Sequence, residues 1–301
     1  MIEIKQCLIC DGPIAHGRKG LVAPFLAERI WNRKAFNVRI AKCANCGFAF
    51  FNPRMEESEE NRLYEGYRSA QYQQMRFRHE PWYTDILNNQ LSAETGTLDH
   101  RRQIVASALA EYVSGGHIRT VLDFGGDQGQ LIQQLDIPDK YVFDISGTRS
   151  REGVVPLRSL AECALRSWDL IVCSHVLEHV GFPRGVMSQI KQIARPGTLL
   201  YVEVPHESPF APAVMAKRLA QMLILCGTRL RDAAATLRPS GLYLMHEHVS
   251  FFAAKSLANM ATSLGFSVVK TGEYRTEGSL LLRGDCVWCI AKLPPGETAN
   301  T

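Results

Sequence analysis

Hydrophobic and polar positions alternate with two different periods from about residue 92 to residue 294. Short apolar runs, which are typical of buried strands, occur at 120–124, 141–144, 154–156, 168–174, 199–204, 266–272 and 286–292. Apolar residues at helical spacing lie near 98–114, 128–136, 183–194, 213–236 and 254–264. Strands that alternate with helices predict a doubly wound α/β sheet. We therefore expect one large α/β domain over 92–294.

The remaining residues follow other patterns. Residues 1–55 hold two closely spaced cysteine pairs, which predict a small module of their own. Residues 56–91 are polar and rich in Tyr, Arg and Glu, which predicts a helical connector packed on the larger domain. The final residues, 295–301, carry no apolar pattern, and we expect them to be disordered.

Four cysteines near the start of the chain have the spacing of a zinc site. Cys7 and Cys10 form one C-x2-C pair, and Cys43 and Cys46 form a second. Each pair lets two sulfurs meet one ion, and four thiolates complete the tetrahedral set of a structural Zn²⁺. A module of this size has too small a core to fold without such a staple. The separation of the pairs exceeds that of a compact ribbon, so we expect extra strands or a short helix within 11–42.

Composition narrows the class of protein without naming a function. The chain has 301 residues, of which 46% are hydrophobic and 21% charged, as in ordinary globular proteins. No apolar run is long enough to cross a membrane, and the first residues lack the apolar stretch of a secretory signal. We therefore expect a cytoplasmic protein whose nine cysteines are core thiols or metal ligands.

Charge gives little reason to expect a nucleic-acid partner. The net charge is +4, from 34 Lys and Arg against 30 Asp and Glu. Residues 1–54 alone hold nine basic and three acidic residues, a local balance of +6. This end could face RNA or a phosphorylated substrate, or it could form a solvated basic rim. The solvated rim is the expectation.

A glycine-rich turn follows the first strand of the α/β domain. The strand ends just after Asp123 and leads into Gly125, Gly126 and Gly129. Glycines let the backbone approach a ligand, and a following helix would offer N–H groups to it. Asp144 ends the next strand, where a carboxylate can accept hydrogen bonds from ribose hydroxyls. The turn therefore predicts a nucleotide-type cofactor.

This spacing resembles motif I of class I S-adenosylmethionine-dependent methyltransferases, D-x-G-x-G-x-G, with Asp127 in place of the middle glycine. It does not fit the dinucleotide fingerprint G-x-G-x-x-G. Later segments similar to the same family are SWDLIVCSHVLEH at 167–179, RPGTLLYVEVP at 195–205, and HVSFF at 248–252 leading to GF at 265–266. Sugar C-methyltransferases and bacterial glycan-modifying relatives also carry an amino-terminal C-x2-C module. The resemblance implies a seven-stranded sheet in the order 3-2-1-4-5-7-6, with the last strand antiparallel.

The same resemblance implies S-adenosylmethionine as cofactor and indicates which residues hold it. Asp123 and the glycines of the turn would contact its methionine end, and Asp144 its ribose. Ser174 and His175 end strand 4 and would border the cofactor. For adenine, the expected contacts after strand 3 are Ser159 and Leu160.

Methyl transfer needs a base when the acceptor is a hydroxyl or a carbon acid. Glu178-His179 matches the Glu-His pair after strand 4 of sugar C-methyltransferases, which implies that His179 is the base and Glu178 supports it. The tyrosine that precedes this pair in those enzymes is Val176 here. The same triplet L-E-H shapes the cofactor pocket in other methyltransferases, so both roles stay open. His206 and His246 are further candidates on the acceptor side.

Two histidine patterns are typical of metal sites, and we expect neither to bind a metal. The sequence from His175 to His179 spells H-x-x-E-H, a zinc-protease pattern, but it begins at a strand end and does not lie on one helix. The triplet at 246–248 is expected on a strand, where adjacent residues point to opposite faces.

Residues 212–239 are apolar at helical spacing and otherwise basic. We expect them to cover the acceptor pocket or to form a homodimer face; a basic amphipathic helix would also suit a membrane surface and a lipid-linked glycan. The expected acceptor is a small molecule such as a sugar, nucleotide-sugar or natural-product precursor. The alternatives are an RNA methyltransferase that grips RNA with the basic module, and a non-catalytic binding protein whose cofactor loop is altered at Asp127.

Overall fold

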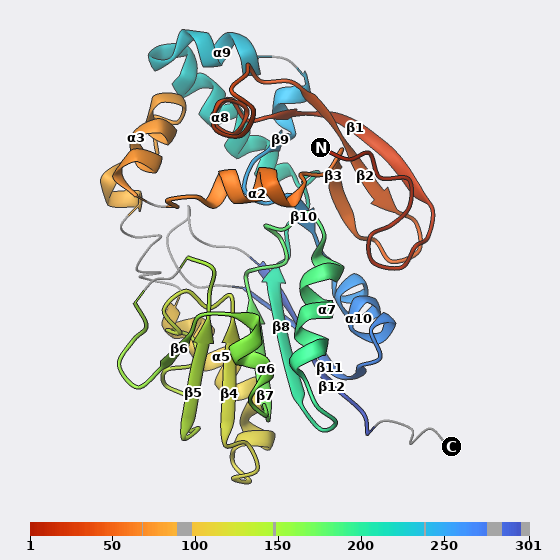
Figure 1. The fold of residues 1–301 in the computed structure, drawn as a ribbon. Helices are drawn as coiled ribbons and strands as arrows, with labels where there is room; N and C mark the ends of the chain where they lie inside the picture. Colours follow the sequence, from red (N-terminus) through yellow and green to blue (C-terminus); the bar gives the residue numbers. More distant parts are fainter. Residues whose placement is uncertain (68, 89–97, 147–148, 238, 276–284, 296–301) are drawn as a thin grey trace. The chain divides into compact units, whose positions relative to one another are not determined.

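The computed structural model describes the chain except residues 68, 89–97, 147–148, 238, 276–284 and 296–301 (Figure 1). Contacts between residues divide the chain into two units. Unit 1 contains Met1–Thr95, Glu178–Gly181 and Glu207–Phe251, and unit 2 contains Gly96–Leu177, Phe182–His206 and Phe252–Thr301. The tail predicted at 295–301 lies, beyond its first residue, outside the described residues.

Unit 1 is built on a five-stranded sheet that joins distant parts of the sequence. Its strands, in the order in which they pair, are β10 (Ser250–Phe251), β3 (Ala49–Asn52), β2 (Asn37–Cys43), β1 (Ile14–Val22) and β9 (Leu244–Met245). The pairs are antiparallel except that β9 runs parallel to β1. The strands and short helix expected between the cysteine pairs are confirmed as β1, α1 (Pro24–Trp31) and β2.

The other helices of unit 1 are α2 (Glu57–Tyr64), α3 (Ala70–His79), α8 (Pro212–Thr228), α9 (Leu230–Thr236) and the 3₁₀ helix η1 (Pro239–Leu242). α1 begins at Pro24, whose fixed φ suits a first helical position, and ends at Asn32 in the left-handed conformation. It buries Phe25 and Ile30 in a core that also contains Tyr72 of α3. Burial of these large side chains provides most of the drive to fold this unit.

A buried arginine ties the segment Glu178–Gly181 to unit 1. The guanidinium of Arg54 donates to the carbonyl oxygens of Gly181 at 2.7 Å and Val180 at 2.6 Å, and to Ser250 Oγ at 2.7 Å. Arg54 is 1% exposed, so these bonds replace the water that its charge requires. The segment therefore packs in unit 1, although the strand just before it, β7 (Leu170–Ser174), belongs to unit 2.

Three boundaries in this part of the chain differ from those expected from the sequence. Residues 56–91 supply α2 and α3, which pack on α1 within unit 1. Residues 207–251 join unit 1 because β9 pairs with β1 and β10 with β3. The single helix expected over 213–236 is two helices, because Arg229 has φ −142° and ψ 69°, outside the helical range.

Unit 2 is a seven-stranded mixed sheet in the order β11-β12-β8-β7-β4-β5-β6. Besides β7, its strands are β4 (Thr120–Phe124), β5 (Asp139–Phe143), β6 (Val155–Leu157), β8 (Leu199–Pro205), β11 (Ser267–Arg275) and β12 (Asp285–Lys292). The strands from β6 to β8 are parallel, and β12 is antiparallel to both of its neighbours. The predicted α/β fold, with strand order 3-2-1-4-5-7-6 and an antiparallel last strand, is confirmed.

Helices cover both faces of this sheet. They are α5 (Leu98–Val113), α6 (Leu160–Ala164), α7 (Pro183–Ile193) and α10 (Ala254–Ser263). In Figure 1, α6 and α7 lie in front of the sheet and α5 lies behind it. Val105 and Leu109 of α5 join Val121 of β4 and Val172 of β7 in one core cluster. Two covered faces explain why the strands read as continuous apolar runs.

The helix expected at 128–136 is wrong. The segment is a series of turns, with short-range bonds such as Leu135 N–H to Ile132 O at 3.1 Å. Positive φ values of 51° at Asp127 and 74° at Gly129 direct the chain into turns where a helix was expected. Ile132 and Leu135 still lie in the core, and this burial produced the helical spacing.

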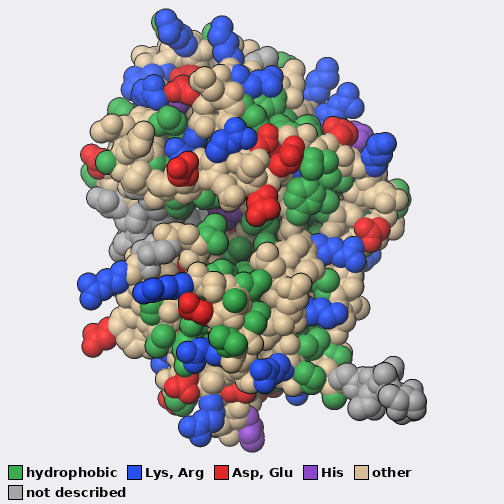
Figure 2. Space-filling model, viewed as in Figure 1, with side chains coloured by type: hydrophobic (Ala, Val, Ile, Leu, Met, Phe, Trp, Pro, Cys, Tyr) green, Lys and Arg blue, Asp and Glu red, His purple; other side chains and the backbone are tan. Residues whose placement is uncertain are grey.

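The outer face of α8 and α9 carries exposed apolar side chains. Leu219, Leu223, Ile224 and Leu230 are between 45% and 76% exposed. Figure 2 shows Lys and Arg side chains at the end of unit 1 where α9 lies in Figure 1. Among the described residues, no helix combines the length and the apolar character needed to cross a membrane.

Candidate active site

The glycine turn lies at the carboxyl end of β4 and packs tightly against its surroundings. Gly125 and Gly129 both have φ of 74°, which side chains rarely adopt. A Cβ on Gly125 would lie 2.5 Å from Val176, and one on Gly129 would lie 2.7 Å from Val154. A Cβ on Gly126 would lie 2.1 Å from the carboxyl carbon of Asp123. The turn therefore accepts only glycine at these three positions.

Asp127 shows how the loop works without its expected middle glycine. Its φ of 51° is left-handed, and aspartate is one of the few side chains that adopt this conformation without a large penalty. The Asp127 N–H donates to Asp144 Oδ2 at 2.9 Å, and the Ser146 N–H donates to Asp144 Oδ1 at 2.8 Å. Two amides therefore fix the carboxylate of Asp144 at the end of β5.

The residues of the turn fit the group that the sequence predicts. Asp123 is 1% exposed directly below Gly126, and Asp144 presents an oriented carboxylate at the carboxyl edge of the sheet. This is the edge where doubly wound sheets bind nucleotides. The methionine end of S-adenosylmethionine suits the glycine turn, and the two ribose hydroxyls suit Asp144. For adenine, the candidates at the start of α6 are Ser159, whose Oγ accepts from the Glu162 N–H at 3.2 Å, and Leu160.

Ser174 and His175 are held by a buried carboxylate on β8, Glu203. Arg101 Nη2 donates to Ser174 Oγ at 2.8 Å, and Ser174 Oγ donates to Glu203 Oε1 at 2.9 Å. His175 Nε2 lies 3.3 Å from Glu203 Oε1, and Tyr201 donates to Glu203 Oε2 at 2.7 Å. Burial alone would raise the pKa of Glu203, but the His175 hydrogen bond and the charge of Arg101 hold it well below its usual range.

This network fixes an unusual backbone at His175. Its φ of 57° is left-handed, and its N–H donates to the carbonyl of Glu203 at 2.9 Å. A strained conformation persists only where its surroundings enforce it, and such positions cluster at functional sites. Arg101 and Glu203 were absent from the predicted site. Arg101 belongs to no quoted motif, and Glu203 lies within the segment at 195–205 that was assigned only as a strand.

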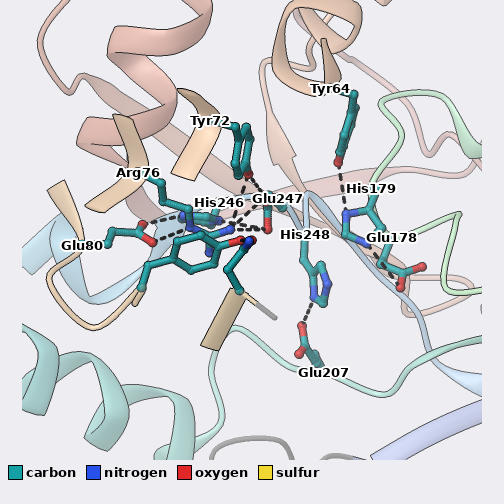
Figure 3. Close-up of polar contacts among 12 residues, drawn as sticks. Tyr64, Tyr72, Arg76, Glu80, Glu178, His179, Glu207, His246, Glu247 and His248 are labelled. Carbon is teal, nitrogen blue, oxygen red and sulfur yellow. Dashed lines mark hydrogen bonds and ion pairs between the residues drawn. The ribbon is translucent and has the colours of Figure 1, made fainter. Parts of the chain in front are cut away.

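In unit 1, His179 is oriented by a tyrosine from α2 (Figure 3). Tyr64 Oη lies 3.1 Å from His179 Nδ1, and Glu178 Oε1 lies 3.8 Å from His179 Nε2. Burial and the charge of Glu247 raise the pKa of Tyr64 well above its ordinary value, so it remains a neutral phenol. In the tautomer with the proton on Nδ1, that N–H donates to Tyr64, and Nε2 keeps the lone pair that a base requires.

A second histidine lies against the first. The rings of His179 and His248 have centroids 4.7 Å apart, and His248 Nδ1 donates to Glu207 Oε2 at 2.7 Å. Burial alone would lower the pKa of His248, but the charge and hydrogen bond of Glu207 raise it to about 9. The positively charged ring of His248 therefore lies against His179, which also has the carboxylate of Glu178 beside it.

The loop between β9 and β10 is fixed by part-buried ion pairs of His246 and Glu247, the two residues before His248 (Figure 3). Glu247 accepts a short hydrogen bond from Tyr72 and bonds from Arg76 Nη1 at 3.1 and 3.2 Å. Burial alone would raise the pKa of Glu247, but the charge of Arg76 lowers it to about 2. His246 Nε2 lies 2.6 Å from Glu80 Oε1.

The predicted catalytic residues thus separate into three environments. Glu178 and His179 lie together, whereas His246 is a member of the Glu80 ion-pair network. The strand expected at 246–248 is wrong, because these residues form a loop in which His246 and His248 face different carboxylates. His206 lies in unit 2, 38% exposed, with Nδ1 3.7 Å from Glu273 Oε2.

The site residues that the sequence did not single out in unit 1 are Tyr64, Tyr72, Arg76 and Glu80. All four lie in or next to α2 and α3, within the segment 56–91 for which the sequence predicts a helical connector. Tyr64 is the tyrosine that contacts His179. Only the high Tyr and Arg content of this segment gave a signal.

The four cysteines of unit 1 meet at one point. Their sulfurs lie within 4.8 Å of one another, with Cys7 and Cys46 at 3.6 Å and Cys10 and Cys43 at 3.6 Å. Four thiolates bound to Zn²⁺ at about 2.3 Å would be roughly 3.8 Å apart. The Ile9 N–H also donates to Cys7 Sγ at 3.4 Å. The donor set and its geometry fit a structural zinc ion.

A family model described as a methyltransferase domain matches residues 96–271, more than half of the 301 residues. The matched range contains the glycine turn, Asp144 and the strands that support them. The chain belongs to this methyltransferase family, and it is a class I S-adenosylmethionine-dependent methyltransferase, as the motifs predicted. No curated protein sequence matches the chain.

Solved structures give weaker likenesses. An O-methyltransferase family protein from Burkholderia thailandensis is 16% identical with a TM-score of 0.44, and the match covers 75% of this chain and 64% of that one. Magnesium protoporphyrin IX methyltransferase from Synechocystis PCC 6803, solved with bound SAH, is 16% identical with a TM-score of 0.47, covering 77% and 98%. A protein from echinomycin biosynthesis is 17% identical with a TM-score of 0.43, covering 64% and 82%. These values are too low to transfer an acceptor to this chain.

Proposed function

We propose that this methyltransferase acts on a small acceptor of the sugar or nucleotide-sugar class, or on a related natural-product precursor. The Glu178-His179 pair and the four-cysteine module support this proposal, since both resemble those of sugar C-methyltransferases. The observation that carries it is the contact of Tyr64 with His179, which lies five residues after the end of β7. An oriented imidazole suits removal of a proton from a hydroxyl or a carbon acid.

We propose the following roles for the cofactor residues. When bound, S-adenosylmethionine supplies an electrophilic methyl group. Asp123 and the turn glycines hold its methionine end, and Asp144 accepts hydrogen bonds from the ribose. Ser159 and Leu160 border the adenine, and Ser174 and His175 line the cofactor at the end of β7. The network around Glu203 keeps His175 in place.

The proposed base is His179, acting through Nε2. Its Nδ1–H donates to Tyr64, which holds the ring and its tautomer. As Nε2 takes the proton from the acceptor, the carboxylate of Glu178 stabilises the imidazolium that forms. The ring of His248 packs against the ring of His179. His179, supported by Glu178, is therefore the proposed general base.

We propose that the four cysteines bind one structural Zn²⁺ and that the protein works in the cytoplasm. Zinc would hold the turn before β1 against the turn between β2 and β3, since each contributes two sulfurs. None of the nine cysteines, all of which are among the described residues, is joined in a disulfide, which suits a reducing compartment. With four sulfur ligands, the ion has no open position for catalysis.

For the outer face of α8 and α9, we propose contact with an anionic membrane surface. α8 contains no acidic residue, its exposed apolar residues repeat at helical spacing, and Arg229 and Arg231 flank the exposed Leu230 in the sequence. This combination is typical of helices that lie in a membrane interface. Binding to phosphatidylglycerol vesicles, lost in the Leu223→Glu variant, would support the proposal. Sedimentation as a homodimer without vesicle binding would contradict it.

The acceptor class is tested with purified protein. Incubation with S-adenosylmethionine and a panel of nucleotide-sugars, followed by mass spectrometry, should give one product heavier by a methyl group and one equivalent of S-adenosylhomocysteine. The control panel contains transfer RNA, and nucleotides that lack the attached sugar of the nucleotide-sugars. Methylation of RNA with no change in any sugar would contradict the proposed acceptor.

A further inference from the structure

Two histidines and a carboxylate converge in unit 1 in a combination that no sequence pattern contains. Glu178, His179 and His248 each place one ligand atom within 4.8 Å of the other two. The convergence depends on the backbone, because the amides of Val249 and Ser250 both donate to the carbonyl of Glu178, at 2.8 and 3.1 Å. The loop that carries His248 is therefore fastened to the segment that carries the other two residues (Figure 3).

The surroundings of the two imidazoles resemble those of metal ligands. A histidine that binds a metal through one nitrogen almost always bonds to an oxygen through the other. His179 has Tyr64 Oη at 3.1 Å from Nδ1, and His248 has Glu207 Oε2 at 2.7 Å from Nδ1. Nε2 is thus the coordinating atom of each ring. Both rings are oriented before any ion arrives.

We propose that Glu178, His179 and His248 bind one divalent transition-metal ion, such as Zn²⁺ or Co²⁺, separately from the four-cysteine site. Two imidazole nitrogens and one carboxylate oxygen suit these ions. Bonds of about 2.0–2.1 Å place tetrahedral ligands roughly 3.3 Å apart. The side chain of His248 is 34% exposed, so an ion at this point can be reached from solvent.

Metal binding and the proposed catalysis compete for one atom, and this part of the inference rests on the proposed function. A bond between the metal and His179 Nε2 uses the lone pair that would take the acceptor's proton. The acceptor then keeps its proton and its weak nucleophilicity. The metal-bound enzyme is therefore inactive, and micromolar transition metal acts as an inhibitor.

Cobalt titration of the full chain, with zinc already at the cysteines, tests the site directly. The expected result is one further equivalent of Co²⁺, with the weak visible bands of nitrogen and oxygen ligands and without the intense thiolate charge-transfer band. Absence of a second equivalent would overturn the proposal. A second equivalent that shows thiolate bands would also overturn it, because the ion would then lie at cysteines.

Two variants and a control locate the ion. His248→Ala should weaken cobalt binding at least tenfold, and Glu178→Gln should do the same with nearly unchanged side-chain volume. The control is His117→Ala, since His117 is an exposed histidine of unit 2. Circular dichroism and a thermal melt establish that each variant is folded. Equal cobalt affinity in wild type and both variants would overturn the assignment.

Activity separates this proposal from the proposed function. If cobalt binds as described but methyl transfer continues, His179 is not the base while the metal site stands. If activity requires His179 but no second cobalt binds, the metal site is wrong while the proposed function stands. When both are right, added cobalt stops turnover at the same concentration in wild type and in the control His117→Ala.

Discussion

The charge of His248 is set by its immediate neighbours, and this makes stability depend on pH. Its pKa is about 9 in the folded chain, against an ordinary value of 6.5. Because the folded state holds the proton more tightly, the stabilisation is complete below about pH 6.5 and is lost as the pH rises through about 9. We predict that the free energy of unfolding falls over this range, and less so in Glu207→Gln. Urea denaturation at several pH values measures the difference, and parallel curves for the two proteins would contradict it.

His179 is expected to affect turnover and not cofactor affinity. Removing a general base costs about 10²–10⁴ in rate. In His179→Ala, kcat should therefore fall by this factor while calorimetry gives an unchanged Kd for S-adenosylmethionine. Tyr64→Phe should cause a smaller loss, since it removes only the hydroxyl that orients the ring. His117→Ala is the control and should match wild type. A fully active His179→Ala enzyme would assign the residue a structural role.

At the scale of elements, the turn between β4 and β5 depends on the backbone conformation of one residue. Asp127 adopts the left-handed region, which glycine enters freely and a β-branched residue resists by about 1–2 kcal/mol. We predict that Asp127→Gly binds S-adenosylmethionine nearly as well as wild type, and that Asp127→Val binds it about 5–30-fold more weakly. Calorimetry measures both. Equal loss in the two variants would show that the carboxylate, and not the backbone, matters.

At the scale of the whole molecule, the two units should respond differently to loss of zinc. The cysteine site joins turns of unit 1 only, while the sheet of unit 2 has its own core. We predict that Cys46→Ser loses its zinc and unfolds unit 1 first, giving two thermal transitions where wild type has one. Metal analysis and calorimetry check this outcome. Cys226→Ser, which changes a cysteine of α8 outside the cluster, is the control and should retain zinc.

Much of the fold of unit 2 could be read from the sequence, because strands and helices leave periodic patterns that are local. The runs at 120–124, 199–204 and 286–292 coincide with β4, β8 and β12 to within one residue. The pattern gave a wrong prediction at 128–136. Buried apolar side chains there have helical spacing, but positive φ angles at Asp127 and Gly129 belong to turns. Periodicity records burial, and burial does not specify backbone conformation.

The sequence by itself indicated the α/β sheet, the glycine turn with Asp144 and the two cysteine pairs, since each strand, turn or pair is a local pattern along the chain. Only the tertiary structure decided which side chains surround His179. Tyr64 is 115 residues from it, and His248 reaches it through a loop held by β9 and β10. Such contacts follow from strand pairing and a buried arginine, which leave no periodic signal. The residues proposed to hold the cofactor could therefore be predicted from local sequence, whereas the surroundings of the proposed base depend on the tertiary fold.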